Sequence, residues 1–482
     1  MGKIFPLFLL LLTGCYVNKA MIDPWGYAPE GACCYWLPDT KGRDLACQEE
    51  ENCPEIPDED CILSLAEVLD IALVNNTNTQ ITWAQARQAA AEYGQSQASA
   101  LPEITADFHH THSQTSVLAS QVELGPTATR QEVIVSDQTL WGPTAYVTYT
   151  IFDFGQRRYT SQAARYALYY ADYIHNQAVQ SVLETITLDY YDTLYQNKLL
   201  EAKEADLATA LETLDAAELG LRQGARDLSD VLQARTDALL AEIQLSQQHQ
   251  IAHTSNATLL DDMGLPSNAE INIDRLPLVD PREVRLDSVD DYLETAFHCR
   301  PDLLGARASL ASAEMSLKAA KRQWLPQIDY SLDIGRTYWK GGFHDDYNYT
   351  STFSVSMPLF TGFYIRNSVK LSRAKVEEAK ASLKQIELEV IKAITTSHYN
   401  VGVAYETLKA ANRFLESAKE QYAIAIAQYR EGVNTILDVV SAQSSLFNAR
   451  AQQAQATQEW FSSLATLSYS AGIISANPED FR

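Results

Sequence analysis

Two proline-free stretches, Gly155–Leu221 and Gly362–Tyr429, constrain the fold more than any other feature of this sequence. Each is about 67 residues long and rich in residues that favour helix. At about 1.5 Å per residue, a continuous helix of that length would extend on the order of 100 Å. These stretches therefore predict an extended helical architecture rather than a series of compact domains.

The long stretches belong to an internal duplication. Leu101-Pro102 recurs as Leu325-Pro326 with an offset of 224, as Ser64 does in Ser288. After the hairpin the offset between matching residues is smaller. Gly155 matches Gly362 at an offset of 207. Gly224 matches Gly432, and Gly264 matches Gly472, both at an offset of 208. Matches in a constant order indicate two copies of one unit. We place the repeats at residues 62–266 and 288–474, joined by a linker over 267–287, with 17 extra residues in the first hairpin segment.

Each repeat begins with a helix and continues with a strand pair. Apolar residues at helical spacing predict helices over 65–101 and 289–325, each ended by the proline that follows. The apolar period then changes from 3.6 to 2, which predicts β-hairpins over 103–154 and 327–361. Strands with one apolar and one polar face suit a membrane barrel, in which about 9–11 residues cross the bilayer.

A second helix pair completes each repeat. Glycines interrupt the helical sequence and predict turns at 222–227 and 430–435, followed by returning helices over 228–263 and 436–471. Residues 475–482 form a C-terminal tail.

The N-terminus reads as an export signal. Lys3 precedes an apolar run, Ile4–Leu12, and small residues lead to Cys15 in Leu12-Thr13-Gly14-Cys15. This pattern matches a bacterial lipobox, so we expect residues 1–14 to be removed and Cys15 to carry the lipid. The rival interpretation is an ordinary signal peptide with an accidental cysteine.

A Cys-rich extension over 15–61 follows the signal. Six cysteines remain after Cys15, and export favours disulfides, although the sequence does not choose the pairing. The candidates are Cys33, Cys34, Cys47, Cys53, Cys61 and Cys299. A metal site is the weaker alternative, because the extension has no His and no paired CxxC spacing.

Charge and motifs exclude several classes of function. The net charge of −25 argues against a nucleic-acid partner. The sequence has no nucleophile–base arrangement, phosphate-binding Gly loop or HExxH motif, so we expect neither an enzyme nor a cofactor. His109, His110 and His112 are read as polar residues of the first hairpin rather than as a metal site.

Four strands per chain cannot close a barrel, because known membrane barrels need about eight or more. An open sheet edge in lipid leaves backbone groups unpaired, at several kcal/mol each. Insertion therefore requires an oligomer, and three chains would supply twelve strands. The predicted fold class is mainly α with membrane β: an α-helical barrel of duplicated helix hairpins with a trimeric 12-stranded β-barrel.

The lipobox, the duplicated order of elements, the Leu359-Phe-Thr-Gly362 segment and the Tyr429-x-x-Gly432 turn resemble TolC-like outer-membrane efflux proteins, in particular their lipidated OprM-like branch. The resemblance covers about Ile62–Ile474. It implies a homotrimer, lipid-anchored in the outer membrane with a periplasmic helical extension. Such a trimer is a passive exit duct for small molecules, which it receives from an inner-membrane pump and a periplasmic adaptor.

The resemblance also assigns gate residues. Asp438 matches an inward aspartate that forms a ring in the trimer, while Ser441 stands where many members have a second aspartate. Crowded like charges would raise the pKa of such a ring. Asp230 and Tyr429 match the latch between the two turns. The family's latch Arg is replaced by Asn434, and Arg430 or Arg222 is the suggested substitute.

Two other functions stay open from the sequence. A protein secretion outlet uses the same architecture. A lipid-anchored periplasmic coiled-coil scaffold would need no pore, and it would also have no need for two apolar-faced strand pairs.

Overall fold

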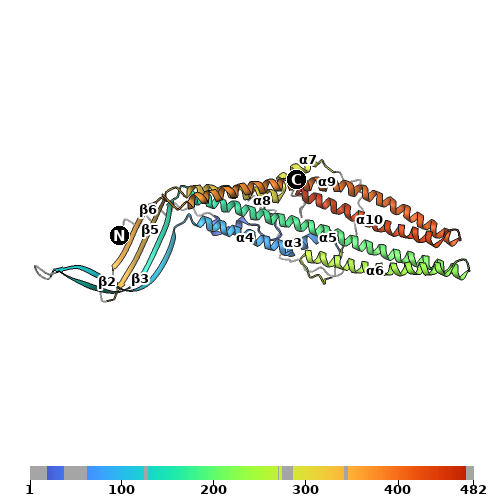
Figure 1. Cartoon of the computed structure of the whole chain (residues 1–482), viewed down its shortest axis with the longest axis horizontal. Helices are drawn as coiled ribbons and strands as arrows, with labels where there is room; N and C mark the ends of the chain where they lie inside the picture. Colours follow the sequence, from blue (N-terminus) through green and yellow to red (C-terminus); the bar gives the residue numbers. More distant parts are fainter. Residues whose placement is uncertain are drawn as a thin grey trace. The chain divides into compact units, whose positions relative to one another are not determined.

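The computed structural model describes residues 19–36, 62–123, 129–269, 271–273, 286–340 and 346–473, and Figure 1 shows their course. The chain divides into two compact units. Unit 1 comprises the described residues of 1–27, 89–167 and 309–379, and unit 2 those of 28–88, 168–308 and 380–482. Among the described residues, no helix combines the length and the hydrophobicity that a membrane-spanning helix requires.

Unit 1 contains a four-stranded antiparallel sheet in the order β2-β3-β5-β6. Its strands are β2 (Glu103–Glu123), β3 (Thr129–Phe152), β5 (Gln327–Trp339) and β6 (Asp346–Ser356). Each repeat supplies one hairpin, and β3 pairs with β5, which places Tyr149 opposite Tyr330. The predicted hairpins are confirmed, but the strands of the first are 21 and 24 residues long, well beyond a single crossing.

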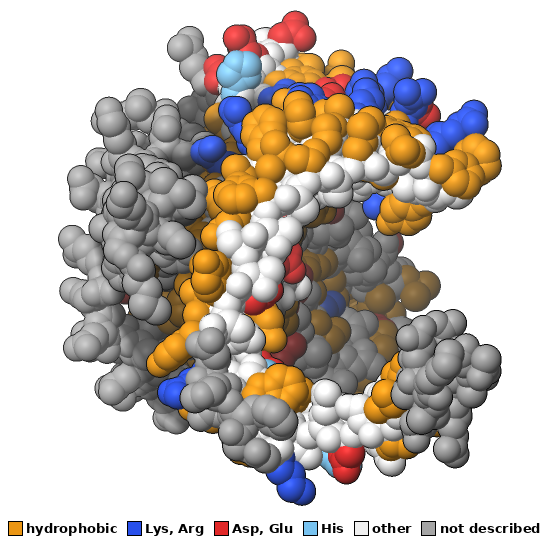
Figure 2. Space-filling view, turned by 90° about the vertical axis from the view of Figure 1, so that its left-hand side faces the viewer, with side chains coloured by type: hydrophobic (Ala, Val, Ile, Leu, Met, Phe, Trp, Pro, Cys, Tyr) orange, Lys and Arg blue, Asp and Glu red, His pale blue; other side chains and the backbone are white. Residues whose placement is uncertain are grey.

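One face of the sheet exposes apolar side chains. On β6, Tyr349, Phe353 and Val355 are 68%, 66% and 71% exposed, and Figure 2 shows hydrophobic side chains gathered along the curved strands. Among the described residues, β2 and β6 each have one strand partner. Their outer edges therefore carry backbone groups that only another chain can pair in lipid.

The long helices form two antiparallel hairpins. They are α5 (Gln156–Arg222), α6 (Leu228–Asp262), α9 (Tyr364–Arg430) and α10 (Ile436–Ala471), within two residues of the predicted bounds. Both connecting turns use a left-handed glycine, Gly224 at φ 71° and Gly432 at φ 82°. Ala225 N–H bonds to Gly220 O, and Val433 N–H bonds to Gln428 O. This is the Schellman arrangement, and it explains why each turn needs its glycine.

The predicted single helix at the start of each repeat is wrong. The first repeat has α3 (Leu65–Asn75) and α4 (Thr77–Ala98), and the second has α7 (Val289–Cys299) and α8 (Pro301–Arg322). Asn76 and Arg300 are extended, with ψ of 127° and 122°. Proline disfavours helical backbone in the residue before it, which accounts for Arg300. Asn76 instead accepts a hydrogen bond from Asn78 N–H and thereby caps α4.

The structure aligns the two repeats better than the match of Gly155 to Gly362 in the sequence did. Left-handed backbone occurs at Phe154-Gly155 in the first repeat and at Gly362-Phe363 in the second. Phe154 therefore corresponds to Gly362, at the same offset of 208 that relates α5 to α9. With an offset of 224 between α4 and α8, the second hairpin segment is 16 residues shorter, so the values of 207 and 17 are corrected.

In unit 2, residues 28–36 of the Cys-rich extension dock on α5. Asn176 and Trp36 exchange two hydrogen bonds, with Trp36 N–H donating at 2.7 Å and Asn176 Nδ2 donating at 2.6 Å. Buried His175 contacts Cys34 O at 3.1 Å through Nε2. A short parallel pair, β1 (Ile62–Leu63) with β4 (Asn272–Ile273), lies in the same unit.

The cysteines are placed in part. Cys34 is disulfide-bonded, and its Sγ lies 3.9 Å from Cys33 Sγ. Cys299 is a free thiol, so a disulfide at this position is a prediction that the structure does not support. Burial raises the pKa of the Cys299 thiol and keeps it protonated. Cys15, Cys47, Cys53 and Cys61 lie outside the described residues.

Candidate functional site

The two residues predicted as a latch are in contact in unit 2. Tyr429, near the end of α9, donates its hydroxyl proton to Asp230 Oδ2 in the first turn of α6 at 3.3 Å. The Tyr429 side chain is only 2% exposed. Burial, followed by the charge of Asp230, raises the pKa of Tyr429 to about 12. The phenol therefore stays protonated at neutral pH and can act as the donor.

A residue that the sequence reasoning did not select completes this contact. Arg226 lies in the turn before α6, and its guanidinium carbon sits 4.1 Å from the centre of the Tyr429 ring. Its Nη2 donates to Tyr429 O at 2.7 Å and to Asn434 O at 2.8 Å. One cation thus stacks on the latch ring and ties the first turn to the backbone of the second.

The suggested substitutes for the missing arginine are wrong. Arg430 pairs with Glu212 at 2.7 Å, and Arg222 Nε faces Glu218 O of its own helix at 3.4 Å. Arg226 follows Gly224 by two residues in the first turn. Asn434 occupies the same position in the second turn, two residues after Gly432. Comparing the two turns of the duplication was the sequence signal that could have identified it.

Gly220 makes room for the arginine. A Cβ at this position would lie 2.5 Å from Arg226 Cγ, which is closer than two non-bonded carbon atoms can approach. The Arg226 side chain packs directly over the last turn of α5, because the glycine there has no side chain. We call Arg226, Asp230 and Tyr429 the turn latch.

Asp438 has a local partner within the chain. Thr435 donates to Asp438 Oδ2 from its hydroxyl at 2.7 Å and from its backbone N–H at 3.0 Å, which forms a capping box at the start of α10. The Thr435 side-chain bond, then its backbone bond, lowers the pKa of exposed Asp438 below its usual 3.8. The predicted rise in pKa requires other copies of the carboxylate, and so it stays a prediction for the trimer.

Two polar clusters join the helix hairpins further along unit 2. Thr213 on α5 donates to Gln443 Oε1 on α10 at 3.0 Å and lies 3.3 Å from the Tyr422 hydroxyl of α9. In the second cluster, Asp206 on α5 accepts a hydrogen bond from Arg450 Nη1 on α10 at 2.6 Å. The Lys203 Nζ atom lies 3.8 Å from the same carboxylate. Neither cluster was predicted, since isolated Thr, Gln and Asp residues in long helices carry no positional signal.

Replacing Asp438 by Asn is expected to lower the ratio of K⁺ to Cl⁻ permeability in planar bilayers. A ring of carboxylates favours cations, and Asn keeps the shape of the side chain without its charge. Asp291→Asn is a matched control, because Asp291 accepts the same two bonds from Ser288 at the start of α7. A loss of selectivity in both variants, or in neither, would contradict an axial role for Asp438.

Comparison with known proteins adds independent information. The family model described as outer membrane efflux protein matches residues 68–265 and 293–472, which together are most of the chain. Nodulation protein T of Rhizobium leguminosarum bv. trifolii is 25% identical over 484 residues, covering 97% of this chain and 96% of that protein. Outer membrane protein TolC of Escherichia coli is 23% identical, covering 64% and 65% respectively.

Among solved structures, the outer-membrane channel OprN superposes with a TM-score of 0.75 at 18% identity. The match covers 86% of this chain and 93% of OprN. At that identity the likeness establishes the fold, with its long helix pairs and four antiparallel strands.

Proposed function

Because the chain belongs to the TolC-like outer membrane efflux protein family, we propose that it is a passive exit duct for small molecules, held shut by the turn latch. As a member it is an outer-membrane efflux channel with a periplasmic helical extension, and it is not an enzyme. Channels of this family are homotrimers that work with periplasmic adaptors and inner-membrane pumps. The cargo, the latch and the lipid anchor are the parts that we propose.

The observation that carries the proposal is the bonding of Arg226 across the two turns. A helix hairpin needs no cation between its turn and that of its neighbour in order to fold. Arg226 nevertheless donates to two carbonyls of the second turn and covers the Tyr429 ring. A contact of this kind fixes the spacing of the two turns, as a gate between movable hairpins requires.

The turns also present a surface for a partner. Val433, Leu437 and Leu228 are 72%, 67% and 60% exposed beside the latch. Exposed apolar residues next to charged ones are typical of a protein contact site. We infer that a periplasmic adaptor docks here and that its binding competes with the latch.

Flux through the purified, full-length protein tests the duct. In liposomes we expect slow permeation of small sugars by the wild type and faster permeation once the latch is removed. A sealed membrane in both cases would instead support a scaffold without a pore. Export of small fluorescent substrates from cells, compared with secretion of a protein toxin, separates the efflux role from the secretion outlet.

We further propose that Cys15 is lipidated. Replacing Cys15 with Ser is expected to abolish incorporation of labelled palmitate while leaving the protein in the outer-membrane fraction, because inserted strands hold it without the lipid. Fractionation after a salt wash measures this. Release of the variant into the soluble periplasm would contradict insertion, and unchanged labelling would contradict lipidation.

A further inference from the structure

The helix ends of unit 1 are basic in an otherwise acidic protein. Residues 89–98, 156–167, 309–322 and 364–379 adjoin the strands and together contain ten Lys and Arg against four Asp and Glu, whereas the whole chain has a net charge of −25. Figure 2 shows Lys and Arg side chains grouped next to hydrophobic ones along the upper rim of the molecule. Concentrated positive charge beside an apolar surface indicates contact with anionic groups at a membrane boundary.

Exposed aromatic residues lie between the strands and these helix ends. Phe360, Phe363 and Tyr364 are 75%, 58% and 70% exposed where β6 leads into α9. Tyrosine favours the headgroup level of a bilayer, because its ring is apolar and its hydroxyl is polar. This applies to Tyr364, and the two phenylalanines beside it add exposed apolar surface. With the strands inserted in the membrane, the basic helix ends that follow these residues would lie at the headgroups of the periplasmic leaflet.

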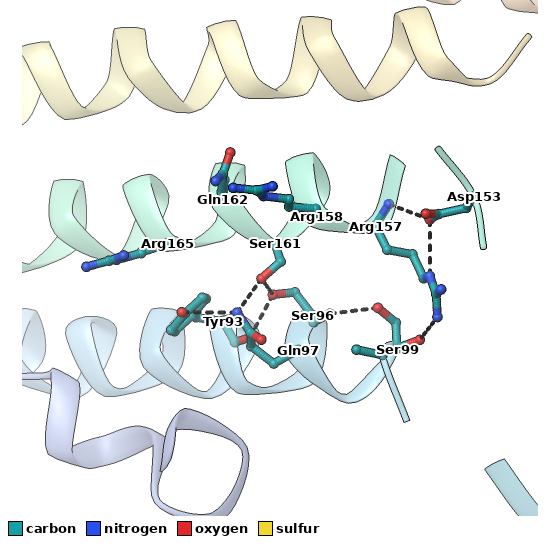
Figure 3. A pocket seen from close by; sticks show the side chains of 11 residues that line it. Tyr93, Ser96, Gln97, Ser99, Asp153, Arg157, Arg158, Ser161, Gln162 and Arg165 are labelled. Carbon is teal, nitrogen blue, oxygen red and sulfur yellow. Dashed lines mark hydrogen bonds and ion pairs between the residues drawn. The ribbon is translucent and has the colours of Figure 1, made fainter. Parts of the chain in front are cut away.

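A cavity of about 410 Å³ opens at this level between α4 and α5. Its wall carries three arginines of α5 together with serine, glutamine and tyrosine side chains of the two helices (Figure 3). We call it the α4–α5 pocket. Its volume lies within the usual range for sites of small ligands.

One arginine of the pocket is used in the fold. Arg157 pairs with Asp153 at 3.1 Å and donates to Ser99 O and Thr150 O at 2.8 and 2.6 Å. It ties the end of β3 to both helices, as the dashed lines in Figure 3 show in part. Its charge is already compensated, so it does not attract a ligand.

Arg158 is different. It is exposed, and no ion pair or hydrogen bond to it is found among the described residues. Arg165 lies seven residues further along α5, about two helical turns away and so on the same side of the helix. The pocket wall thus holds an uncompensated cation, Arg158, with a second arginine nearby.

The pocket also contains a preorganised hydroxyl. Ser161 is buried. Its Oγ accepts a hydrogen bond from Gln97 Nε2 at 2.6 Å and lies 3.4 Å from Ser96 Oγ. Ser96 gives its single hydroxyl proton to Tyr93 O at 2.7 Å, so the bond that positions Ser161 Oγ is the one from Gln97. No bond donated by the Ser161 hydroxyl is found among the described residues, which leaves its proton for an acceptor in the pocket. An oxyanion between this hydroxyl and Arg158 would find both a donor and an opposite charge.

The N-terminal segment supports the same level in the membrane. Helix α2 (Lys19–Ile22) and turn η1 (Pro24–Tyr27) pack on α4, where a Cβ on Gly94 would meet Ala20 O at 2.8 Å. The Tyr27 ring lies 5.9 Å from that of Tyr93, which lines the pocket. Lys19 follows Cys15 by four residues, a span of at most about 14 Å. A lipid on Cys15 would enter the bilayer close to this pocket.

We propose that the α4–α5 pocket binds the phosphate of an anionic phospholipid headgroup in the periplasmic leaflet. The pocket supplies the charge of Arg158, with Arg165 nearby, and a hydroxyl donor from Ser161, and it adjoins the strands that enter the membrane. The proposal rests on the insertion of the protein in the outer membrane. Bound lipid would fix the depth of the helix ends at the membrane surface.

Native mass spectrometry of the full-length protein in detergent tests the site. The probes are dioctanoyl phosphatidylglycerol, dioctanoyl phosphatidylcholine and inorganic phosphate. We expect the anionic lipid to bind, and Arg158→Gln with Arg165→Gln to weaken its binding at least tenfold, since each basic residue contributes about one kcal/mol near anionic lipid. Arg235→Gln with Arg413→Gln, in unit 2, removes the same charge and should leave binding unchanged.

Several results would overturn the assignment. Unchanged binding of phosphatidylglycerol in the pocket variant, or equal binding of phosphatidylcholine, would show that the pocket is not the site. Inorganic phosphate binding as tightly as the lipid would assign the pocket to a free anion instead. The same spectra report the oligomer mass, so a failure of trimer formation is seen separately from a failure of lipid binding.

Discussion

A channel carrying Arg226→Ala is expected to conduct several times more current than the wild type in planar bilayers. Two bonds from a charged donor contribute about 1.5–3 kcal/mol each in measured cases, and the ring contact adds about 0.5–2. Even a loss of about 3 kcal/mol of preference for the closed state, below the sum of these contributions, shifts the closed-to-open ratio by more than a hundredfold. Single-channel conductance and open probability measure the shift.

Two companion variants make this result specific. Asp230→Ala with Tyr429→Phe removes the 3.3 Å latch bond and is expected to raise conductance less than Arg226→Ala. Arg430→Ala removes an exposed ion pair with Glu212, which should matter little, because such pairs contribute about 0–1 kcal/mol. Arg226→Ala channels that conduct like the wild type would refute the latch.

The second large effect is expected at the buried ion pair of unit 2. Arg450→Met leaves Asp206, whose side chain is 3% exposed, without the partner that lies at 2.6 Å. Breaking a buried pair on one side typically costs about 3–5 kcal/mol. We expect a clear fall in the apparent melting temperature of the helices, followed by circular dichroism at one scan rate.

The pH dependence of this effect follows from the pKa of Asp206. Burial already raises that pKa, with Arg450 and Lys203 opposing the rise, and loss of Arg450 raises it further. When the pKa of a carboxyl is higher in the folded than in the unfolded state, its protonation stabilises the fold at low pH. This contribution to the free energy of unfolding is lost as the pH rises through the pKa of the folded state. The deficit of Arg450→Met should therefore shrink between neutral pH and pH 5.

A double variant separates charge from packing. Asp206→Leu with Arg450→Met removes both charges and is expected to recover much of the lost stability. Lys203→Met, whose amine lies 3.8 Å from Asp206, should cost less than Arg450→Met. If the loss of stability in Arg450→Met did not depend on pH, or if the double variant were as unstable as Arg450→Met, the stabilisation would come from packing around the aliphatic part of the arginine.

Much of this fold follows from local signals in the sequence. Glycines that need a left-handed backbone marked both helix turns, and the change in apolar period marked both hairpins. The breaks at Asn76 and Arg300 were missed for different reasons. Pro301 was a visible signal for the second. At Asn76 the side chain caps α4 and also donates to Asp262 O at 2.7 Å, and such bonds depend on the three-dimensional structure.

The site was less predictable than the fold. Tyr429 and Asp230 followed from the resemblance, and the structure brings their side chains together. Arg226 could have been found only by comparing the two turns, because an arginine in a polar turn is unremarkable by itself. The pairing of Asp206 with Arg450 joins residues 244 positions apart, and no periodic pattern in a single sequence indicates such a contact.

The native mass of the mature protein in detergent shows whether three chains together form the duct. In the described part of the chain, the four-stranded sheet has two unpaired outer edges, on β2 and β6, so we expect a single species with the mass of three chains. A stable monomer would contradict it, because its open strand edges could not remain in lipid.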